Sequence, residues 1–108
     1  MTTMSSVNKL QLLQQNVQQL TMQKQQFQEQ LTELDSALLE LGNTDKAYRI
    51  IGKIMISTPS KTLAQDLQEK REMVEVRIKN IEKQEEKLKQ NMEEAQQEVL
   101  KELKSKKN

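Results

Sequence analysis

The chain has 108 residues, of which 34% are hydrophobic, 2% aromatic and 31% charged, and its formal net charge at pH 7 is +1. It contains no histidine and no cysteine, which removes the commonest general base, the commonest metal ligand and all thiol chemistry. The balanced charge argues against a chain built to bind nucleic acid or an acidic membrane. The scarcity of large apolar side chains argues against an independent globular core and favours long helices with a narrow apolar seam.

The first predicted element is a helix from about residue 6 to residue 42. Its apolar residues alternate in steps of three and four, which is the heptad pattern of a left-handed coiled coil and argues against disorder. Position a holds Leu10, Val17, Lys24, Leu31 and Leu38, and position d holds Leu13, Leu20, Phe27, Leu34 and Leu41. Lys24 either fixes register or partner choice, or lays its stem along the seam while its ammonium reaches water. We expect Ser5 or Ser6 to cap the helix, and Gly42 to end it in a left-handed conformation.

A change of period marks the second element, a β-hairpin over about residues 46–58. Residues 47–51 and 54–57 are rich in β-branched and aromatic side chains, and Gly52-Lys53 lies between them. Glycine in the first position of a two-residue loop is typical of a type II′ turn. The sequence therefore predicts two short antiparallel strands joined by this turn.

The third element is a second helix, over about residues 60–104, which begins after Thr58-Pro59. Its seam has Ala64, Arg71, Ile78, Glu85, Met92 and Val99 at position a, and Leu67, Val74, Ile81, Leu88 and Ala95 at position d. Arg71 and Glu85 are the charged exceptions. Because a tight hairpin returns the chain, we expect the two helices to pair antiparallel along their seams. Leu41 would then lie near Leu63, Leu10 near Ala95, and Met4 near Leu100.

An isolated two-stranded hairpin is marginal in water, and this one presents unpaired edges with many apolar side chains. Closing a barrel with hairpins of other subunits would remove those edges, so we expect an oligomer; the alternative is that the hairpin packs on its own helices. The predicted oligomerisation residues are Tyr48, Ile50, Ile51, Gly52, Ile54, Met55 and Ile56.

Apolar residues off the seam gather in two places. Leu39, Leu63, Met73 and Val76 lie near the hairpin, where they would sit under an assembly or at a subunit contact. A second group falls at the opposite end of the helix pair, where flexible methionine and leucine side chains suit adaptable binding of many partners. The alternative for this second group is scattered apolar residues on frayed helix ends.

Catalytic and ligand-binding motifs are absent from the sequence. There is no glycine-rich phosphate loop, and serine has no histidine partner. Paired carboxylates such as Glu85-Glu86 are best explained as a solvated helix face. The basic end consists of Lys101, Lys104, Lys106 and Lys107; it is short and lacks aromatic residues, so we interpret it as a solubilising tail rather than a nucleic-acid contact. We therefore expect no enzyme activity, no cofactor and no metal.

The sequence resembles the β-type subunits of archaeal prefoldin over nearly its whole length. The stretches that carry the resemblance are residues 46–56, KAYRIIGKIMI, and residues 67–78, LQEKREMVEVRI, followed by residues 81–85, IEKQE. The resemblance implies a single domain over residues 1–108 that is mainly α-helical, with a long antiparallel two-helix coiled coil and one β-hairpin. Having one hairpin places the chain with the β-type rather than the α-type subunits.

The same resemblance implies a function. Two α-type and four β-type subunits would form a heterohexamer whose hairpins build a β-barrel platform. Unfolded proteins would be held at the coiled-coil tips without ATP and passed to a group II chaperonin. The client contacts inferred from position at the tips are Met1, Met4, Val7, Leu10, Leu12, Leu13, Val99, Leu100 and Leu103.

Two other functions stay open at this point. One is a structural coiled-coil scaffold or tether that binds a single partner through its helix faces. The other is an RNA-binding helical arm like that of a seryl-tRNA synthetase, which would need a basic stripe where this chain has mixed charges. The chain has no apolar run long enough for a membrane and no signal-peptide pattern at Met1 to Asn8. We therefore expect a cytoplasmic protein, with no nucleic-acid or membrane partner.

Overall fold

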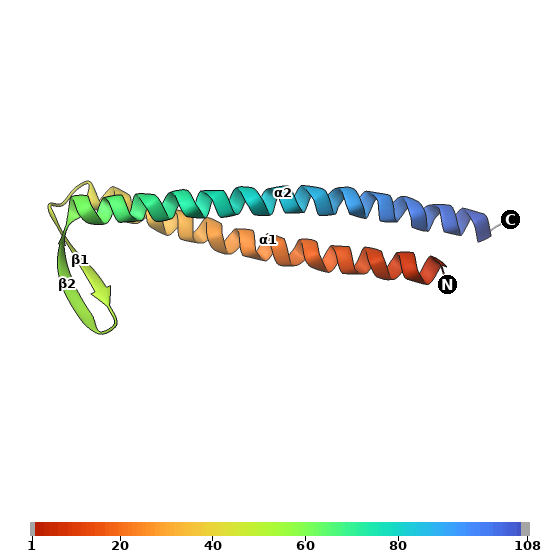
Figure 1. The fold of residues 1–108 in the computed structure, drawn as a ribbon, viewed down its shortest axis with the longest axis horizontal. Coiled ribbons are helices and arrows are strands. Elements are labelled where there is room, and N and C mark those ends of the chain that lie inside the picture. Colours follow the sequence, from red (N-terminus) through yellow and green to blue (C-terminus); the bar gives the residue numbers. More distant parts are fainter. Residues whose placement is uncertain (1, 107–108) are drawn as a thin grey trace. The chain divides into compact units, whose positions relative to one another are not determined.

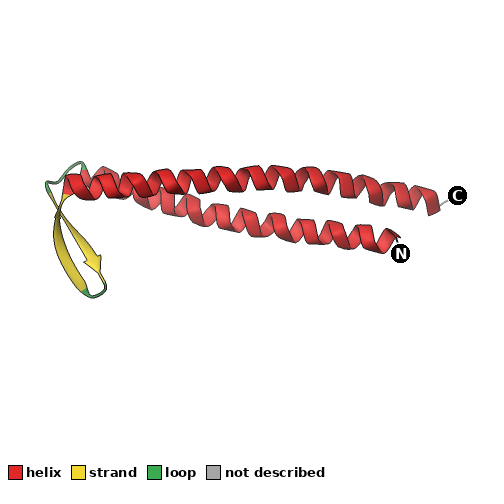
Figure 2. Cartoon of the chain, in the orientation of Figure 1, coloured by secondary structure: helices red, strands yellow, loops and turns green. Residues whose placement is uncertain are grey.

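The computed structural model describes the backbone of residues 2–106 and the side chains of residues 6–105. Four elements follow one another: helix α1 (Thr2–Leu41), strand β1 (Lys46–Ile51), strand β2 (Ile54–Pro59) and helix α2 (Ser60–Lys106) (Figure 1). Only short loops separate them (Figure 2). The predicted order of helix, hairpin and helix is confirmed.

Helix α1 begins at Thr2, which is earlier than the predicted start near residue 6. Ser6 therefore lies inside the helix and is not its cap. The physical reason is that Ser6 continues the heptad one step before Leu13, at position d, and is buried there. A residue that packs across the seam favours continuing the helix on its N-terminal side, whereas a capping residue would mark the start of the helix. Ser5, the other predicted cap, lies outside the described side chains.

The end of α1 also differs from the prediction for Gly42. The only glycine with a positive φ in the described chain is Gly52, so Gly42 is not left-handed. Its amide donates to the Leu38 carbonyl at 3.2 Å, and the Asn43 amide donates to the Glu40 carbonyl at 3.1 Å. The helix therefore ends by tightening its last turn, which satisfies its final carbonyls without a glycine-specific conformation.

The hairpin forms as the sequence predicts. Ile51 pairs with Ile54 across the two-residue loop, and the antiparallel register runs back to Lys46 opposite Pro59. Gly52 has a φ of 62°, and no residue other than glycine in the described part of the chain has a positive φ. A positive φ at the first loop residue alone is the signature of the type II′ turn, because type I′ needs it at both loop residues.

The base of the hairpin is joined to the start of α2. The Ser60 amide donates to the carbonyl of Asp45 at 3.3 Å. One free amide at the start of α2 is therefore satisfied by the loop that leads into β1. The Arg49 guanidinium of β1 also lies 3.2 Å from the Asp66 carboxylate of α2. These contacts tie the base of the hairpin to the first turns of the helix.

The contacts within the chain divide it into two compact units, and the two helices run antiparallel in each. The hairpin unit is Gln26–Ile78, in which Asp35 of α1 meets Arg71 of α2. The terminal unit contains α1 up to Gln25 and α2 from Lys79 onward. There, the hydroxyls of Ser6 and Thr21 reach Glu102 and Glu85 respectively, so rising residue numbers on α1 meet falling numbers on α2.

Candidate functional surfaces

The buried side chains of α2 follow the predicted seam. Each one that is buried lies at heptad position a or d: Val74, Ile78, Ile81, Glu85 and Ala95. Their partners at a and d on α1 are half-buried. The seam therefore uses the apolar residues that the heptad predicts, and apolar residues elsewhere on the helices remain available for other contacts. In the hairpin unit, the predicted neighbours Leu41 and Leu63 line one hollow.

Two charged exceptions in the predicted seams contact each other in the terminal unit. The Lys24 Nζ lies 2.9 Å from Oε1 of Glu85, and the Thr21 hydroxyl donates to Oε2 of Glu85 at 3.1 Å. The Glu85 side chain is 8% exposed. The hydrogen bond from Lys24 lowers the pKa of Glu85 and raises the pKa of Lys24, against the opposing effect of burial on each. Lys24 thus has a partner inside the seam, as the register interpretation requires.

A second polar contact crosses the seam near the chain ends. The Ser6 hydroxyl donates to Oε1 of Glu102 at 2.9 Å, and Ser6 is 7% exposed. Both residues occupy position d when the heptads are continued one step outward from Leu13 and Ala95. The sequence interpretation missed this pair because it stopped at the last apolar residue. Extending the heptad in both helices is the signal that finds it.

Charged pairs also connect the helices in the hairpin unit, closer to solvent. Arg71 at position a donates to Asp35 of α1 and to Glu75 one turn further along α2. These two hydrogen bonds raise the pKa of Arg71. The Arg77 guanidinium carbon lies 5.7 Å from the centre of the Phe27 ring, a cation–π distance. The seam charges Lys24, Glu85 and Arg71 therefore each have an oppositely charged partner.

The hairpin exposes most of its apolar surface. Cross-strand partners share a face, so Tyr48, Ile50 and Met55 lie on one face, and Ile51, Ile54 and Ile56 lie on the other. All six are exposed, from 44% for Ile56 to 69% for Ile50. The buried hairpin residue is Ala47, at the base. The predicted oligomerisation residues thus lie together on the two faces of the hairpin, and helices α1 and α2 do not cover them.

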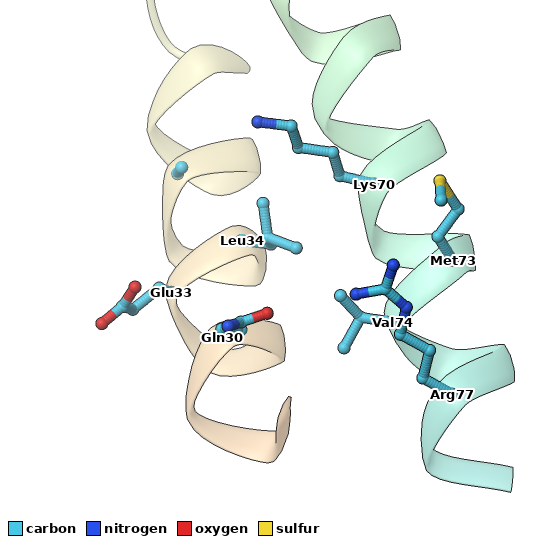
Figure 3. A pocket seen from close by; sticks show the side chains of 8 residues that line it. Gln30, Glu33, Leu34, Lys70, Met73, Val74 and Arg77 are labelled. Carbon is cyan, nitrogen blue, oxygen red and sulfur yellow. The ribbon is translucent and has the colours of Figure 1, made fainter. Parts of the chain in front are cut away.

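A hollow of about 580 Å³ lies between the helices of the hairpin unit (Figure 3). Leu34 of α1 and Val74 of α2 extend toward each other there, and Lys70 reaches from α2 toward α1. Met73 extends from α2 away from α1 and is 58% exposed. The lining combines apolar side chains with lysine, arginine and glutamate, and it holds no arrangement typical of catalysis.

The predicted client-binding residues separate into two described groups. Leu12, Leu100 and Leu103 are exposed, at 58%, 58% and 46%. The residues that are half-buried are Val7, Leu10, Leu13 and Val99. Met1 lies outside the described residues, and the side chain of Met4 lies outside the described side chains. All described members belong to the terminal unit, with exposed leucines on both helices.

The described residues also limit what the chain can bind or cross. Residues 6–105 contain no group of three or more acidic side chains placed to hold a metal ion. Neither helix has a stretch that is long and apolar enough to cross a membrane within the described residues.

Comparison with known proteins gives a consistent result. A family model described as "Prefoldin subunit" matches residues 4–106. The "Prefoldin subunit beta" of Archaeoglobus fulgidus is 35% identical over 96 residues, covering 86% of this chain and 83% of that protein. The one from Methanospirillum hungatei is 33% identical over 106 residues, covering 95% and 88%.

The fold agrees with a solved structure of the same kind. The crystal structure of the prefoldin beta subunit from Thermococcus strain KS-1 superposes with a TM-score of 0.87 at 31% identity, over 94% of this chain and 91% of that one. The helix–hairpin–helix order is thus the fold of a known family. The chain belongs to the prefoldin subunit family, where it is similar to the β-type subunits.

Proposed function

We propose that this chain is an ATP-independent chaperone subunit that holds unfolded proteins at the end of the helix pair formed by the start of α1 and the end of α2. It would pass them to a group II chaperonin. In the proposed assembly, two α-type and four β-type subunits form a heterohexamer, and this chain supplies β-type subunits. The whole chain, residues 1–108, would act as one prefoldin-like domain in the cytoplasm.

The observation that carries the client-holding proposal is the exposure of three leucines in the terminal unit. Leu12, Leu100 and Leu103 lie off the heptad seam, so pairing of α1 with α2 does not need them. Exposed leucine side chains can contact the apolar residues of an unfolded chain without a shaped pocket. The charged and polar residues around them, such as Lys101 and Lys104, would keep an empty binding end soluble.

The half-buried members of the predicted set have a different place in this proposal. Leu10, Leu13 and Val99 contribute to the seam and Val7 lies beside it, so they would support the exposed leucines and add apolar area at this end of the helix pair. Met1 and Met4 remain predicted client contacts, on the strength of their position beside Val7 in the sequence and the adaptability of methionine side chains.

Weak contacts suit this function. Burying one large apolar side chain is worth about 1.5–3 kcal/mol before the cost of ordering the partners. Several subunits acting on one client would raise the overall affinity through effective concentration. Each contact remains weak enough to break by itself, so transfer of the client would need no nucleotide, cofactor or catalytic step.

The hairpin supports the proposed assembly. Its two strands have unpaired edges within the described chain, and both of its faces carry exposed isoleucine side chains. Such edges promote pairing with another chain unless they are covered. Joining hairpins from several subunits into a closed barrel would pair the edges and bury Tyr48, Ile50, Ile51, Ile54, Met55 and Ile56.

The competing function is a scaffold whose hairpin serves only to assemble it and whose helices bind one specific partner. A holding assay separates the two. A chemically unfolded protein is diluted into buffer without ATP, in the presence of this chain assembled with an α-type subunit, and light scattering is followed. We expect suppressed aggregation at near-stoichiometric amounts, for several unrelated unfolded proteins. Unchanged scattering in the presence of a demonstrated hexamer would favour the scaffold.

A further inference from the structure

Lys24, Thr21 and Glu85 make a charged contact inside the seam of the terminal unit that spans about one helical turn, and we call these three residues the charged layer. Lys24 of α1 and Glu85 of α2 both occupy heptad position a, where coiled coils usually place apolar residues. Their Nζ–Oε1 distance is 2.9 Å, and Thr21 reaches the second carboxylate oxygen of Glu85 at 3.1 Å. Both oxygens of a nearly buried carboxylate are therefore satisfied by side chains of α1.

Such a layer is a poor source of stability. A buried ion pair gains little over apolar residues of similar size, because removing both charges from water offsets their attraction. Breaking the pair by removing one partner is unfavourable, because the other charge stays buried. The layer mainly affects specificity: it lowers the energy of the native helix pairing relative to other pairings of the same helices.

The alternatives are pairings between copies of the chain. If α1 paired in parallel and in register with the α1 of another copy, Lys24 would face a second Lys24 at the same layer. An equivalent pairing of α2 with α2 would place Glu85 against Glu85, and Arg71 against Arg71. Each arrangement brings like charges together in a seam, whereas pairing α1 with α2 joins opposite charges.

We propose that the Lys24–Glu85–Thr21 layer selects the partner helix, directing each α1 to α2 and disfavouring pairing of like helices between copies. Selection matters for this chain because most of the other seam positions hold apolar residues that fit either helix. Any oligomer that gathers several copies also raises the local concentration of competing helices. The proposal concerns helix pairing and holds whether or not the assembled protein binds unfolded clients.

Replacing both charges by leucine tests selection separately from stability. In Lys24→Leu/Glu85→Leu, two charged seam positions become apolar, so we expect a midpoint of thermal unfolding equal to or above that of the parent chain. We also expect pairing between copies to appear. A purely stabilising ion pair would instead give a lower midpoint, and that result would overturn the proposal.

Cysteine cross-linking reports the pairing directly, because the chain has no cysteine of its own. Leu20→Cys places a thiol at position d, where parallel in-register α1 helices of two copies would form a disulfide under oxidised glutathione. We expect few interchain disulfides with the native layer and several-fold more with the leucine pair. Gln19→Cys, which is exposed and off the seam, measures random collisions. If Leu20→Cys cross-links equally in the chain with the native layer and in the chain with the leucine pair, the layer does not select the partner helix.

The exchanged pair Lys24→Glu/Glu85→Lys is the matched control for charge. It keeps opposite charges between α1 and α2 and like charges between identical helices. We therefore expect interchain cross-linking through Leu20→Cys to stay as low as with the native layer. Cross-linking at the level of the leucine pair would show that complementary charge is not what selects the partner.

Discussion

At the scale of single residues, the polar positions of the seam are the most informative. The heptad predicts which residues point inward, and the buried Val74, Ile78 and Ile81 follow it. The sequence alone left two interpretations of Lys24. The structure assigns Glu85 as its partner. Counting outward from the Leu41–Leu63 pair does not identify Glu85, because the count places Lys24 opposite a residue about one helical turn before it. Side-chain reach along the helix decides this contact.

The Lys24–Glu85 contact predicts a pH dependence. The hydrogen bond from Lys24 holds the pKa of Glu85 below its ordinary value in the folded chain. A carboxyl with a depressed pKa contributes stability that is complete above its unfolded-state pKa and is lost as pH falls through the folded-state pKa. The groups facing this layer are Lys24 and Thr21 on α1, with Lys89 and Glu82 nearby on α2.

The measurement compares the parent chain with Glu85→Gln by thermal unfolding at several pH values. We expect the parent to be the more stable at neutral pH. The difference in stability between the two chains should shrink as pH falls from the ordinary carboxyl pKa through the lower folded-state pKa of Glu85. Glu86→Gln, an exposed neighbour on the same helix, controls for the loss of one negative charge. A difference between parent and Glu85→Gln that stays constant into acid would contradict the assigned contact.

At the scale of elements, sequence patterns predicted what each segment forms better than where it ends. The change of period at residue 46 and the Gly52-Lys53 loop predicted the hairpin and its turn type. The end of α1 was predicted wrongly, because glycine after a leucine suits a left-handed cap but does not require one. Ser6 was wrong as a cap because a partner on the other helix, Glu102, outweighs local capping preference.

The two glycines therefore make a matched test of the hairpin. A Cβ at Gly52 would meet no other atom within 4 Å, so the cost of Gly52→Ala is conformational and arises from its φ of 62°. That cost is about 1–3 kcal/mol for an L-residue held in a sparsely populated region of φ and ψ. Gly42 lacks a positive φ, and a Cβ there would lie 3.4 Å from the Leu39 carbonyl oxygen, an ordinary contact.

We expect Gly52→Ala to weaken assembly through the hairpin, and Gly42→Ala to leave it unchanged. The helical circular dichroism signal of both variants should stay close to that of the parent, because neither glycine lies within a helix. Sedimentation with an α-type subunit measures the assembly. Equal assembly by both variants would contradict either the turn type or the role of the hairpin in joining subunits.

At the scale of the whole molecule, the family could be inferred from the sequence, but the exposed part of the proposed client surface could be only partly inferred. Heptads identify the residues of the seam, and apolar side chains outside positions a and d are free to contact other molecules. The structure shows how much of each side chain is exposed, which separates Leu12, Leu100 and Leu103 from half-buried neighbours such as Leu13. No residue type marks these leucines, because a surface proposed to hold many clients needs no fixed motif.

The central claim is that these exposed leucines hold clients while the hairpin assembles the subunits. The most direct measurement compares two variants in the assembled state. One is Leu12→Ser/Leu100→Ser/Leu103→Ser. The control is Met22→Ser, which removes an exposed apolar side chain of α1 that belongs neither to the predicted client-binding set nor to the apolar group near the hairpin.

Assembly with the α-type subunit is measured first, by sedimentation, and then suppression of aggregation of an unfolded protein without ATP. We predict that both variants assemble, that the control suppresses aggregation like the parent, and that the leucine variant loses most of that activity. Full suppression by the assembled leucine variant would contradict the account.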